Sequence, residues 1–282
     1  MRKIFLKKIL YFTYIFLNSK NLIRDLISKY IIFFSYEKIK YKKLIKKYKK
    51  ILANKEILDV GCGYGVFSYH ISFYAKSVDA LDIDLNVIKN ALKHNNINYF
   101  NIDIENYKTK KKYDFIICSH VLEHIKNDKK VFRKITELLR KGGYILLSTP
   151  NKNKIISYNF RLSNFLKKFF KKNFSEILKE KPHNHEREGY SKEDFINIKK
   201  NTSMEIVDIF YDKSSLILYE IFFLLPIYIR IILLPIFSFL EYINHKFDDK
   251  DGMNIYVLFR KKSKKRKKRD IKLKTKINLY IM

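Results

Sequence analysis

Three glycines alternate with other residues in one short segment of this sequence, Asp59-Val60-Gly61-Cys62-Gly63-Tyr64-Gly65. An apolar strand pattern precedes the segment and a helical pattern follows it, so the glycines are expected at a strand-to-helix turn. Glycine permits a sharp turn and lets a ligand approach where a Cβ atom would collide. The dinucleotide pattern is Gly-x-Gly-x-x-Gly, whereas the third glycine here comes one residue earlier, and Val66 occupies the dinucleotide position. The segment therefore favours a nucleoside with an amino-acid tail over a dinucleotide.

Histidines that could serve as a general base occur in two places, because imidazole titrates nearest to neutrality. His120, Glu123 and His124 follow a predicted strand and are expected to converge at the carboxyl edge of a sheet, where open α/β sheets bind ligands. His183 and His185 precede a Ser-x-x-Asp pattern that predicts a helix start. The alternative interpretation is structural: these side chains would satisfy backbone groups at a turn or lie in a polar surface loop.

Short strands that alternate with helical segments are expected to position these residues. The strands are predicted at 56–60, 78–82, 98–102, 113–118 and 144–148, with two later strands at 205–211 and 254–260. Helices are predicted at 66–75, 85–94 and 128–139, and Lys141-Gly142-Gly143 is expected to end the last of them. This alternation indicates parallel strands with helical crossovers, and hence a doubly wound sheet.

In this order and at these spacings, the segments resemble the motifs of class I S-adenosylmethionine-dependent methyltransferases. The resemblance covers about 37–211, with 254–261 as a final strand, and its motifs are the glycine loop, 78–84, 101–104, 113–125 and 138–151. It is strongest with small-molecule and lipid-type members, such as ubiquinone-pathway O-methyltransferases and glycan-cluster methyltransferases. It implies an α/β fold, a Rossmann-like doubly wound seven-stranded sheet with N-terminal helices and an apolar helical insert between the last two strands.

The resemblance also implies S-adenosylmethionine as the cofactor and assigns residues to it. Asp82 would bind the ribose hydroxyls, with Asp84 as the alternative, and Asp103 would accept from the adenine amino group. A carboxylate suits the ribose because it can accept from both hydroxyls at once. The cofactor set is Asp59, Gly61, Gly63, Gly65, Asp82, Ile83, Asp103, Ile104 and Ser119, and the catalytic candidates are His120, His124 and His185.

A metal is not expected at the turn after the fourth strand. In the related ubiquinone-pathway enzymes, a comparable turn carries acidic residues and a histidine linked to a divalent metal. Here His120 replaces one of those acids. The stretch from His185 to Arg187 resembles one that lies near the acceptor pocket in this methyltransferase group. The resemblance therefore implies methyl transfer to a small or lipid-linked acceptor, with O-methylation favoured.

The net charge of +31 suggests an acidic partner, although the abundance of Lys, Ile and Asn also fits AT-rich coding. An RNA methyltransferase is an alternative, but the fourth strand lacks the Asn/Asp-Pro-Pro-aromatic motif of base-amino methyltransferases, so nucleic acid is the less favoured partner. A noncatalytic S-adenosylmethionine-binding protein is disfavoured because the glycines and acids are intact. The two cysteines, Cys62 and Cys118, suggest no disulfide framework and fit a reducing cytoplasm. The oligomeric state is left open.

Three regions are expected: an amphipathic helical extension at 1–50, a methyltransferase domain at 51–262 that includes an apolar insert at 212–250, and a basic tail at 263–282. The insert is long enough to span a bilayer, but Pro226, Pro235 and Arg230 are expected to interrupt it, and both flanking strands belong to one sheet. A hairpin in one leaflet, an apolar lid over the acceptor, and a helical cover or dimer interface remain alternatives. We expect a cytoplasmic protein with peripheral contact to the anionic inner face of the membrane.

Overall fold

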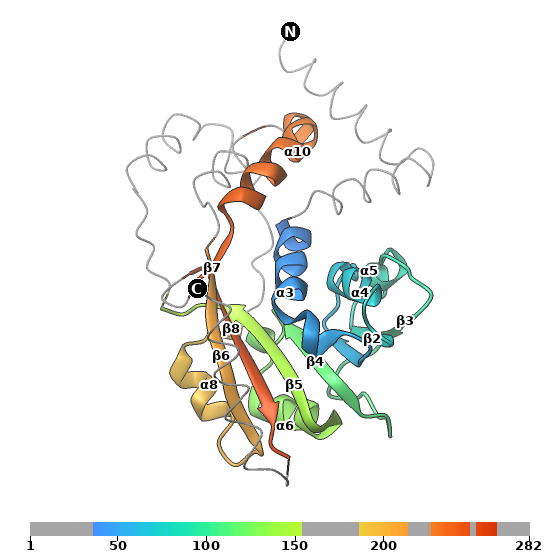
Figure 1. The fold of residues 1–282 in the computed structure, drawn as a ribbon, viewed down its shortest axis with the longest axis vertical. Helices are drawn as coiled ribbons and strands as arrows, with labels where there is room; N and C mark the ends of the chain where they lie inside the picture. Colours follow the sequence, from blue (N-terminus) through green and yellow to red (C-terminus); the bar gives the residue numbers. More distant parts are fainter. Residues whose placement is uncertain (1–35, 154–185, 214–224, 226, 249–251, 264–282) are drawn as a thin grey trace.

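A single mixed sheet organises this chain in the computed structural model, which describes residues 36–153, 186–213, 225, 227–248 and 252–263. Its eight strands lie in the order β3-β2-β1-β4-β5-β8-β6-β7, and helices cover both faces (Figure 1). The strands are β1 Glu56–Val60, β2 Ser77–Asp82, β3 Ile97–Asn101, β4 Tyr113–Ser119, β5 Leu139–Pro150, β6 Met204–Lys213, β7 Lys246–Asp248 and β8 Asn254–Lys261. The helices are α3 Tyr36–Leu52, α4 Val66–Ser72, α5 Leu85–Lys89, the 3-10 helix η1 Leu122–His124, α6 Asp128–Leu138, α8 Lys192–Ile198 and α10 Ile227–Asn244.

The strand pairing confirms a doubly wound α/β sheet. Strands β1 to β5 are parallel to one another, and β8 runs antiparallel between β5 and β6. The seven expected strands are all present, and the count of seven is corrected to eight by β7, which pairs with the end of β6. This short strand is formed where the chain returns from the insert, so sequence periodicity alone did not reveal it.

Several expected boundaries differ from the structure, including that of α4, which ends at Ser72 instead of 75. Helix α5 ends at Lys89 instead of 94, because the Leu92 backbone leaves the helix to donate to the Tyr64 carbonyl at 3.0 Å. Lys141-Gly142-Gly143 does not separate a helix from a strand, since β5 already begins at Leu139. The glycines instead lie in an irregular stretch of β5, where Leu139 pairs with Tyr113 and Tyr144 pairs with Phe115.

Each face of the sheet has its own apolar core. Side chains of α6 and α8 pack on one face, and side chains of α3 and α4 pack on the other. The residues at helical spacing on α3, Tyr41, Leu44, Ile45 and Tyr48, are buried as their spacing indicates, with lysines exposed on its outer side. Helix α3 thus shares a core with β1 and β4, while residues 1–35 lie outside the described part of the chain and the proposed domain limits stay a prediction.

Helix α10 lies within the insert between β6 and β8. It continues through Pro235, where the sequence predicts an interruption, because a helix can lose one backbone hydrogen bond without ending. Among the residues that the structure describes, no helix is both long and apolar enough to cross a membrane.

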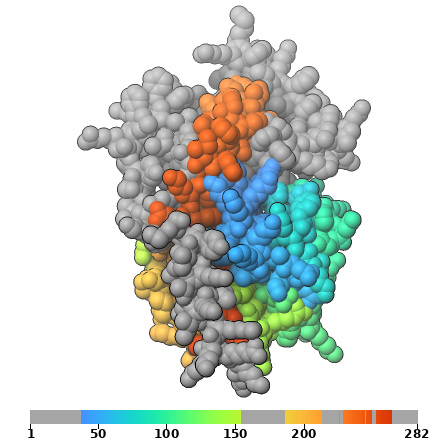
Figure 2. All heavy atoms as spheres, viewed as in Figure 1, coloured from blue at the N-terminus to red at the C-terminus, as the bar shows by residue number. Residues whose placement is uncertain are grey.

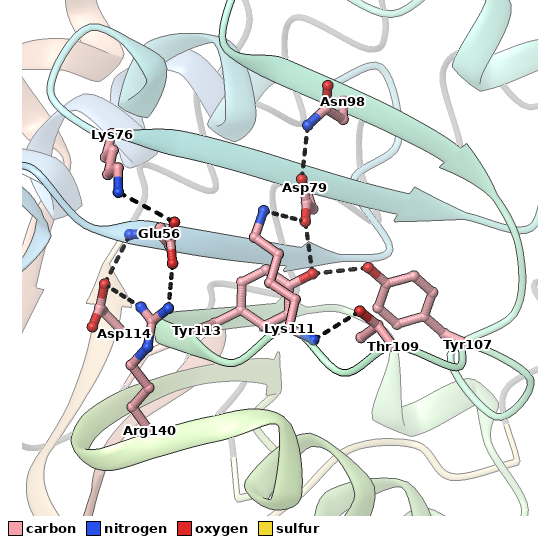
Figure 3. A network of polar contacts seen from close by, with 10 residues as sticks. All are labelled: Glu56, Lys76, Asp79, Asn98, Tyr107, Thr109, Lys111, Tyr113, Asp114 and Arg140. Atoms are coloured by element: carbon pink, nitrogen blue, oxygen red, sulfur yellow. Dashed lines mark hydrogen bonds and ion pairs between the residues drawn. The ribbon is translucent and has the colours of Figure 1, made fainter.

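A buried carboxylate, Asp79, joins three strands on the side of the sheet shown in Figure 3. It accepts from the Lys111 Nζ at 2.6 Å, the Tyr113 hydroxyl at 2.7 Å and the Asn98 amide at 3.0 Å. Burial alone would raise the pKa of Asp79, but these hydrogen bonds outweigh it and hold the pKa below its ordinary value. The ionised form of Asp79 is therefore part of the folded structure.

Replacing this carboxylate should destabilise the fold. We expect Asp79→Ala to lower the free energy of unfolding by about 3 kcal/mol, because it leaves Lys111 and Tyr113 without their buried partner. The wild-type contribution should be fully present above the unfolded pKa of about 3.9 and lost as the pH falls through the lower folded pKa. Urea unfolding between neutral and acid pH measures both effects.

The matched control is Glu205→Ala, which removes an exposed carboxylate on β6 and should change the unfolding free energy by less than about 0.5 kcal/mol. Equal stability of the Asp79 and Glu205 variants at neutral pH would contradict the structural role of Asp79.

Candidate cofactor and active site

The site candidates gather where the order of the sheet reverses. Strand β1 lies between β2 and β4, so the connections that follow β1 and β4 go to opposite faces of the sheet. Ligands bind to open α/β sheets at such a point, beside the carboxyl ends of the strands. The glycine loop follows β1, Asp82 ends β2, and His120 follows β4. The structure therefore brings the predicted cofactor residues and the turn after β4 to one edge.

The glycine loop has a backbone that other residues would rarely adopt. Gly61, Gly63 and Gly65 have φ values of +70°, +54° and +71°, in the left-handed region. A Cβ atom at Gly61 would collide with the Val121 side chain, and one at Gly65 would collide with the Tyr99 hydroxyl. Apart from its chain neighbours, no described atom lies within 4 Å of the Cβ position at Gly63, so this position faces open space in the described part of the chain. Packing requires two of the glycines, and the third leaves room beside the loop for a ligand.

Asp82 joins the loop to the end of β2. Its Oδ2 accepts from the Gly63 backbone amide at 2.8 Å, and its Oδ1 accepts from the Asp84 amide at 3.0 Å. Each carboxylate oxygen has a second lone pair, so Asp82 can still accept from the hydroxyls of a ribose. The next side chain, Ile83, is 74% exposed and offers an apolar surface beside that carboxylate. This arrangement fits a nucleoside whose sugar and base lie at the end of β2.

The alternative carboxylate, Asp84, has another role. It is the N-cap of α5, and its Oδ1 accepts from the Asn86 amide at 2.8 Å. Asp103 forms a similar turn, in which Oδ1 accepts from the Glu105 amide at 2.8 Å. The side chain of Ile104 is buried in a core cluster, so it supports the loop and offers little surface to a ligand. Of these three residues, Asp103 alone keeps its expected role, because its partly exposed side chain can still contact an adenine.

Two further members of the predicted cofactor set are buried beneath the site. Asp59 accepts from the Ser68 hydroxyl at 2.6 Å, which fixes the end of β1 to α4. The Ser119 hydroxyl lies 2.6 Å from the Ser148 hydroxyl on β5, and the Tyr41 hydroxyl of α3 lies 3.5 Å from Ser119. These contacts indicate that the two side chains shape the site from below, where they hold strands and helices together.

His120 and Glu123 form a pair directly after β4. The His120 Nδ1 lies 3.1 Å from the Glu123 Oε1, and the backbone amide of His120 donates to the Ser148 carbonyl at 2.8 Å. Glu123 is 1% exposed, and its Oε2 has no hydrogen-bond partner among the described residues. The His120 side chain is 34% exposed, and its φ of +55° is unusual for a residue other than glycine. The arrangement presents an imidazole to solvent with a buried carboxylate behind it.

The structure says less about the other catalytic candidates. His124 is exposed at the end of η1, and His183 and His185 lie outside the described residues. The segment that follows them contacts the same turn, since the Arg187 amide donates to the Glu123 carbonyl at 3.2 Å. The Arg187 guanidinium also pairs with Asp128 at 3.2 Å. The expected capping box at Ser191 and Asp194 is confirmed.

No group of three or more metal-ligating side chains occurs within the described ranges.

Sequence reasoning did not find several residues that shape the site. Val121 and Tyr99 lie against the glycine loop, and Tyr41 and Ser148 lie beneath Ser119. Their partners are distant in sequence, so no local pattern marks them. Glu123, in contrast, was found from the sequence, because it lies three positions after His120 and a single turn brings such positions together.

Comparison with known proteins identifies the family. The profile of the family described as "Methyltransferase domain" matches residues 33–185, which is more than half of the 282-residue chain. The chain belongs to this methyltransferase family. The expected class, a class I S-adenosylmethionine-dependent methyltransferase with S-adenosylmethionine as its cofactor, is thereby confirmed. The open space at Gly63 and the carboxylate of Asp82 fit that cofactor.

Individual relatives agree with this assignment over part of their length. The chain is 32% identical over 117 residues to the ubiquinone biosynthesis O-methyltransferase of Rickettsia akari. The alignment covers 40% of this chain and 47% of that protein. It is 39% identical over 103 residues to malonyl-[acyl-carrier protein] O-methyltransferase 2 of Ilyobacter polytropus, covering 34% of this chain and 40% of that protein. The methyltransferase chain thus spans less than half the length of each of these relatives.

A solved structure shows the same fold. The protein from Thermotoga maritima described as a possible histamine N-methyltransferase aligns with a TM-score of 0.52 and 15% identity, covering 88% of this chain and 99% of that protein. At this level of identity the similarity supports the Rossmann-like architecture of the methyltransferase and nothing about its acceptor.

The roles of the two carboxylates at the end of β2 can be separated by binding measurements. We expect Asp82→Ala to weaken the binding of S-adenosylhomocysteine by roughly 10- to 100-fold, because charge-assisted hydrogen bonds to the ligand and the loop are lost. Asp84→Asn should bind normally, since an asparagine side chain can still cap α5. Isothermal titration calorimetry provides the measurement, and equal losses in both variants would refute the assignment to Asp82.

Proposed function

We propose that this methyltransferase transfers the methyl group of S-adenosylmethionine to an oxygen of a small or lipid-linked acceptor, with His120 as the general base. The observation that carries the proposal is the pairing of His120 with buried Glu123 at the turn after β4. The next residue, Val121, packs against Gly61 of the glycine loop. The contact of Val121 therefore places His120 next to the cofactor loop. A base that removes a proton from the acceptor would have to lie close to the bound cofactor.

The chemistry divides between the cofactor and the chain. S-adenosylmethionine, when bound, supplies a methyl group already activated on a sulfonium. The glycine loop and Asp82 would hold it, and the protein must position the acceptor and remove its proton. If the His120 Nδ1–H donates to Glu123, the Nε2 is unprotonated and can accept a proton from a hydroxyl. The Glu123 carboxylate would then stabilise the imidazolium.

An oxygen acceptor is supported by this pair. A hydroxyl becomes a better nucleophile when a base removes its proton, whereas a neutral amine already has a lone pair to attack the methyl group. The two relatives described above are both named O-methyltransferases, which agrees with this choice. The relatives' own acceptors are not transferred to this chain, because the matches cover less than half of each protein.

A location at the membrane surface is part of the proposal. Its support is the apolar character of α10 together with the net charge of +31, which favours anionic surfaces. The cytoplasmic location expected from the cysteines likewise remains a prediction. RNA is the other anionic candidate for the acceptor, but none of the contacts among the described residues supports recognition of a base.

Substitutions at the pair test the role of His120. We expect His120→Ala to lower kcat by roughly 100-fold or more, with S-adenosylhomocysteine affinity unchanged, because only proton removal from the acceptor is lost. Glu123→Gln should act in the same direction, since an amide stabilises the imidazolium less well than a carboxylate. His94→Ala is the matched control, as that ring bonds to Asn96 and not to a residue of the turn after β4. An unchanged kcat in His120→Ala would remove it as the base.

The acceptor class can be tested with methyl-labelled cofactor. Purified protein is incubated separately with extracted bacterial lipid and with total RNA, and the incorporated label is measured. We expect label in the lipid fraction, with His120→Ala as the background control. Label in RNA alone would overturn the proposed acceptor class.

A further inference from the structure

Helix α10 carries a stripe of exposed apolar side chains along its length. Ile232 is 71% exposed and Phe239 is 63% exposed, and about half of each remaining side chain of the stripe is also exposed. The exposed apolar residues are Tyr228, Ile232, Ile236, Phe239, Tyr242 and Ile243, which we call the α10 stripe. Their spacing of three or four residues places them on one face of the helix. Figure 2 shows α10 in orange at the surface of the molecule.

Contacts with α3 fix the C-terminal end of α10. The Lys43 Nζ of α3 donates to the Tyr242 carbonyl at 2.8 Å and to the His245 carbonyl at 2.5 Å. These carbonyls belong to the last turn of α10 and the residue after it, where a cation also interacts favourably with the helix dipole. Glu241 and His245 are buried beside them. The α10 stripe is thus an exposed face of a helix whose C-terminal end is held against α3.

The surroundings of the α10 stripe are basic. Glu241 is the only acidic residue of α10, and it is buried, so no carboxylate accompanies the stripe on the surface of the helix. Lys246 on β7, two residues after the end of α10, is exposed. The pKa of Lys43 is lowered by burial first, Glu241 opposes this, and Lys246 adds to the lowering, which shows that Lys246 lies near the end of α10. An apolar stripe close to an exposed lysine matches the chemistry of an anionic bilayer surface.

The position of α10 relates this surface to the active site. Pairing of Pro150 and Asp212 with Asn254 places the ends of β5 and β6 at the same edge of the sheet. The insert that contains α10 leaves the sheet from this edge, which also holds the glycine loop and His120. A surface bound by α10 would therefore lie on the active-site side of the molecule (Figure 1).

We propose that the α10 stripe docks into the interface of an anionic phospholipid bilayer, with Lys246 against the headgroups. Apolar side chains of such a helix enter the boundary between headgroups and acyl chains, and tyrosines such as Tyr228 and Tyr242 are favoured at that depth. A second copy of the chain fits less well, because a net charge of +31 on each copy opposes association. The inference rests on the proposed membrane location and does not depend on methyl transfer.

Vesicle co-sedimentation of the full-length protein tests the docking surface. We use phosphatidylcholine vesicles with and without phosphatidylglycerol, in the absence of cofactor and acceptor. The double variant Ile232→Gln with Phe239→Gln should weaken binding to the anionic vesicles by roughly tenfold or more, because two exposed apolar side chains no longer enter the bilayer. Both positions are exposed, so the variant should keep the wild-type circular dichroism spectrum and Tm.

Two controls separate this surface from other sources of binding. Phe73→Gln removes an exposed aromatic side chain from the region next to α4 and should bind vesicles as the wild type does. His120→Ala should also bind normally, even though it lacks turnover, which distinguishes failure of the docking proposal from failure of the proposed chemistry. The basic residues at 263–282 are present in every variant, so their attraction to anionic lipid is constant.

Three outcomes would overturn the proposal. One is wild-type vesicle binding by the double variant, which would mean that charge alone accounts for the binding. Another is a wild-type dimer in light scattering that the double variant converts to a monomer, which would assign the α10 stripe to a second copy. The third is unchanged vesicle binding with a raised KM for the acceptor, which would make α10 a lid.

Discussion

The hydrogen bond from the Gly63 amide to Asp82 joins the ends of two neighbouring parallel strands, and the rest of the candidate site is arranged around it. The loop can reach Asp82 because its three glycines adopt left-handed backbone angles. Val121 and Tyr99 then pack where side chains on Gly61 and Gly65 would otherwise lie. A single constraint on the backbone thus links β1, β2, β3 and the turn after β4, and it leaves open space only at Gly63.

The turn after β4 shows how a site can retain locally unfavourable features. His120 has a left-handed φ without being glycine, and the Glu123 Oε2 is buried without a hydrogen-bond partner in the described part of the chain. Both features reduce stability, and such strain is concentrated at functional sites. The network around Asp79 contrasts with this, since Lys111, Tyr113 and Asn98 satisfy a carboxylate that is similarly buried. Asp79 supports the sheet, whereas one carboxylate oxygen of Glu123 has no hydrogen-bond partner among the described residues.

The net charge of this methyltransferase does not indicate a partner until the positions of its charged and apolar side chains are known. A net charge of +31 agrees equally with lipid, nucleic acid or compositional drift. The structure adds an apolar stripe on α10 that lies close to the exposed Lys246 and on the active-site edge of the sheet. Lys43 stabilises this arrangement by bonding to carbonyls at the end of α10. The proposed acceptor and the proposed membrane surface would thereby be on the same side of the molecule.

The sequence by itself determined the strands and the glycine loop, because periodicity and glycine spacing are local properties of the chain. Its resemblance to the methyltransferase motifs implied the cofactor class. The sequence also placed His120 and Glu123 on one turn. The tertiary structure decided which residues face each other: Asp84 caps α5, Ile104 enters the core, and Ser119 bonds to Ser148. It also ended α5 early and added β7. These outcomes depend on contacts between segments far apart in sequence, and no local pattern encodes such contacts.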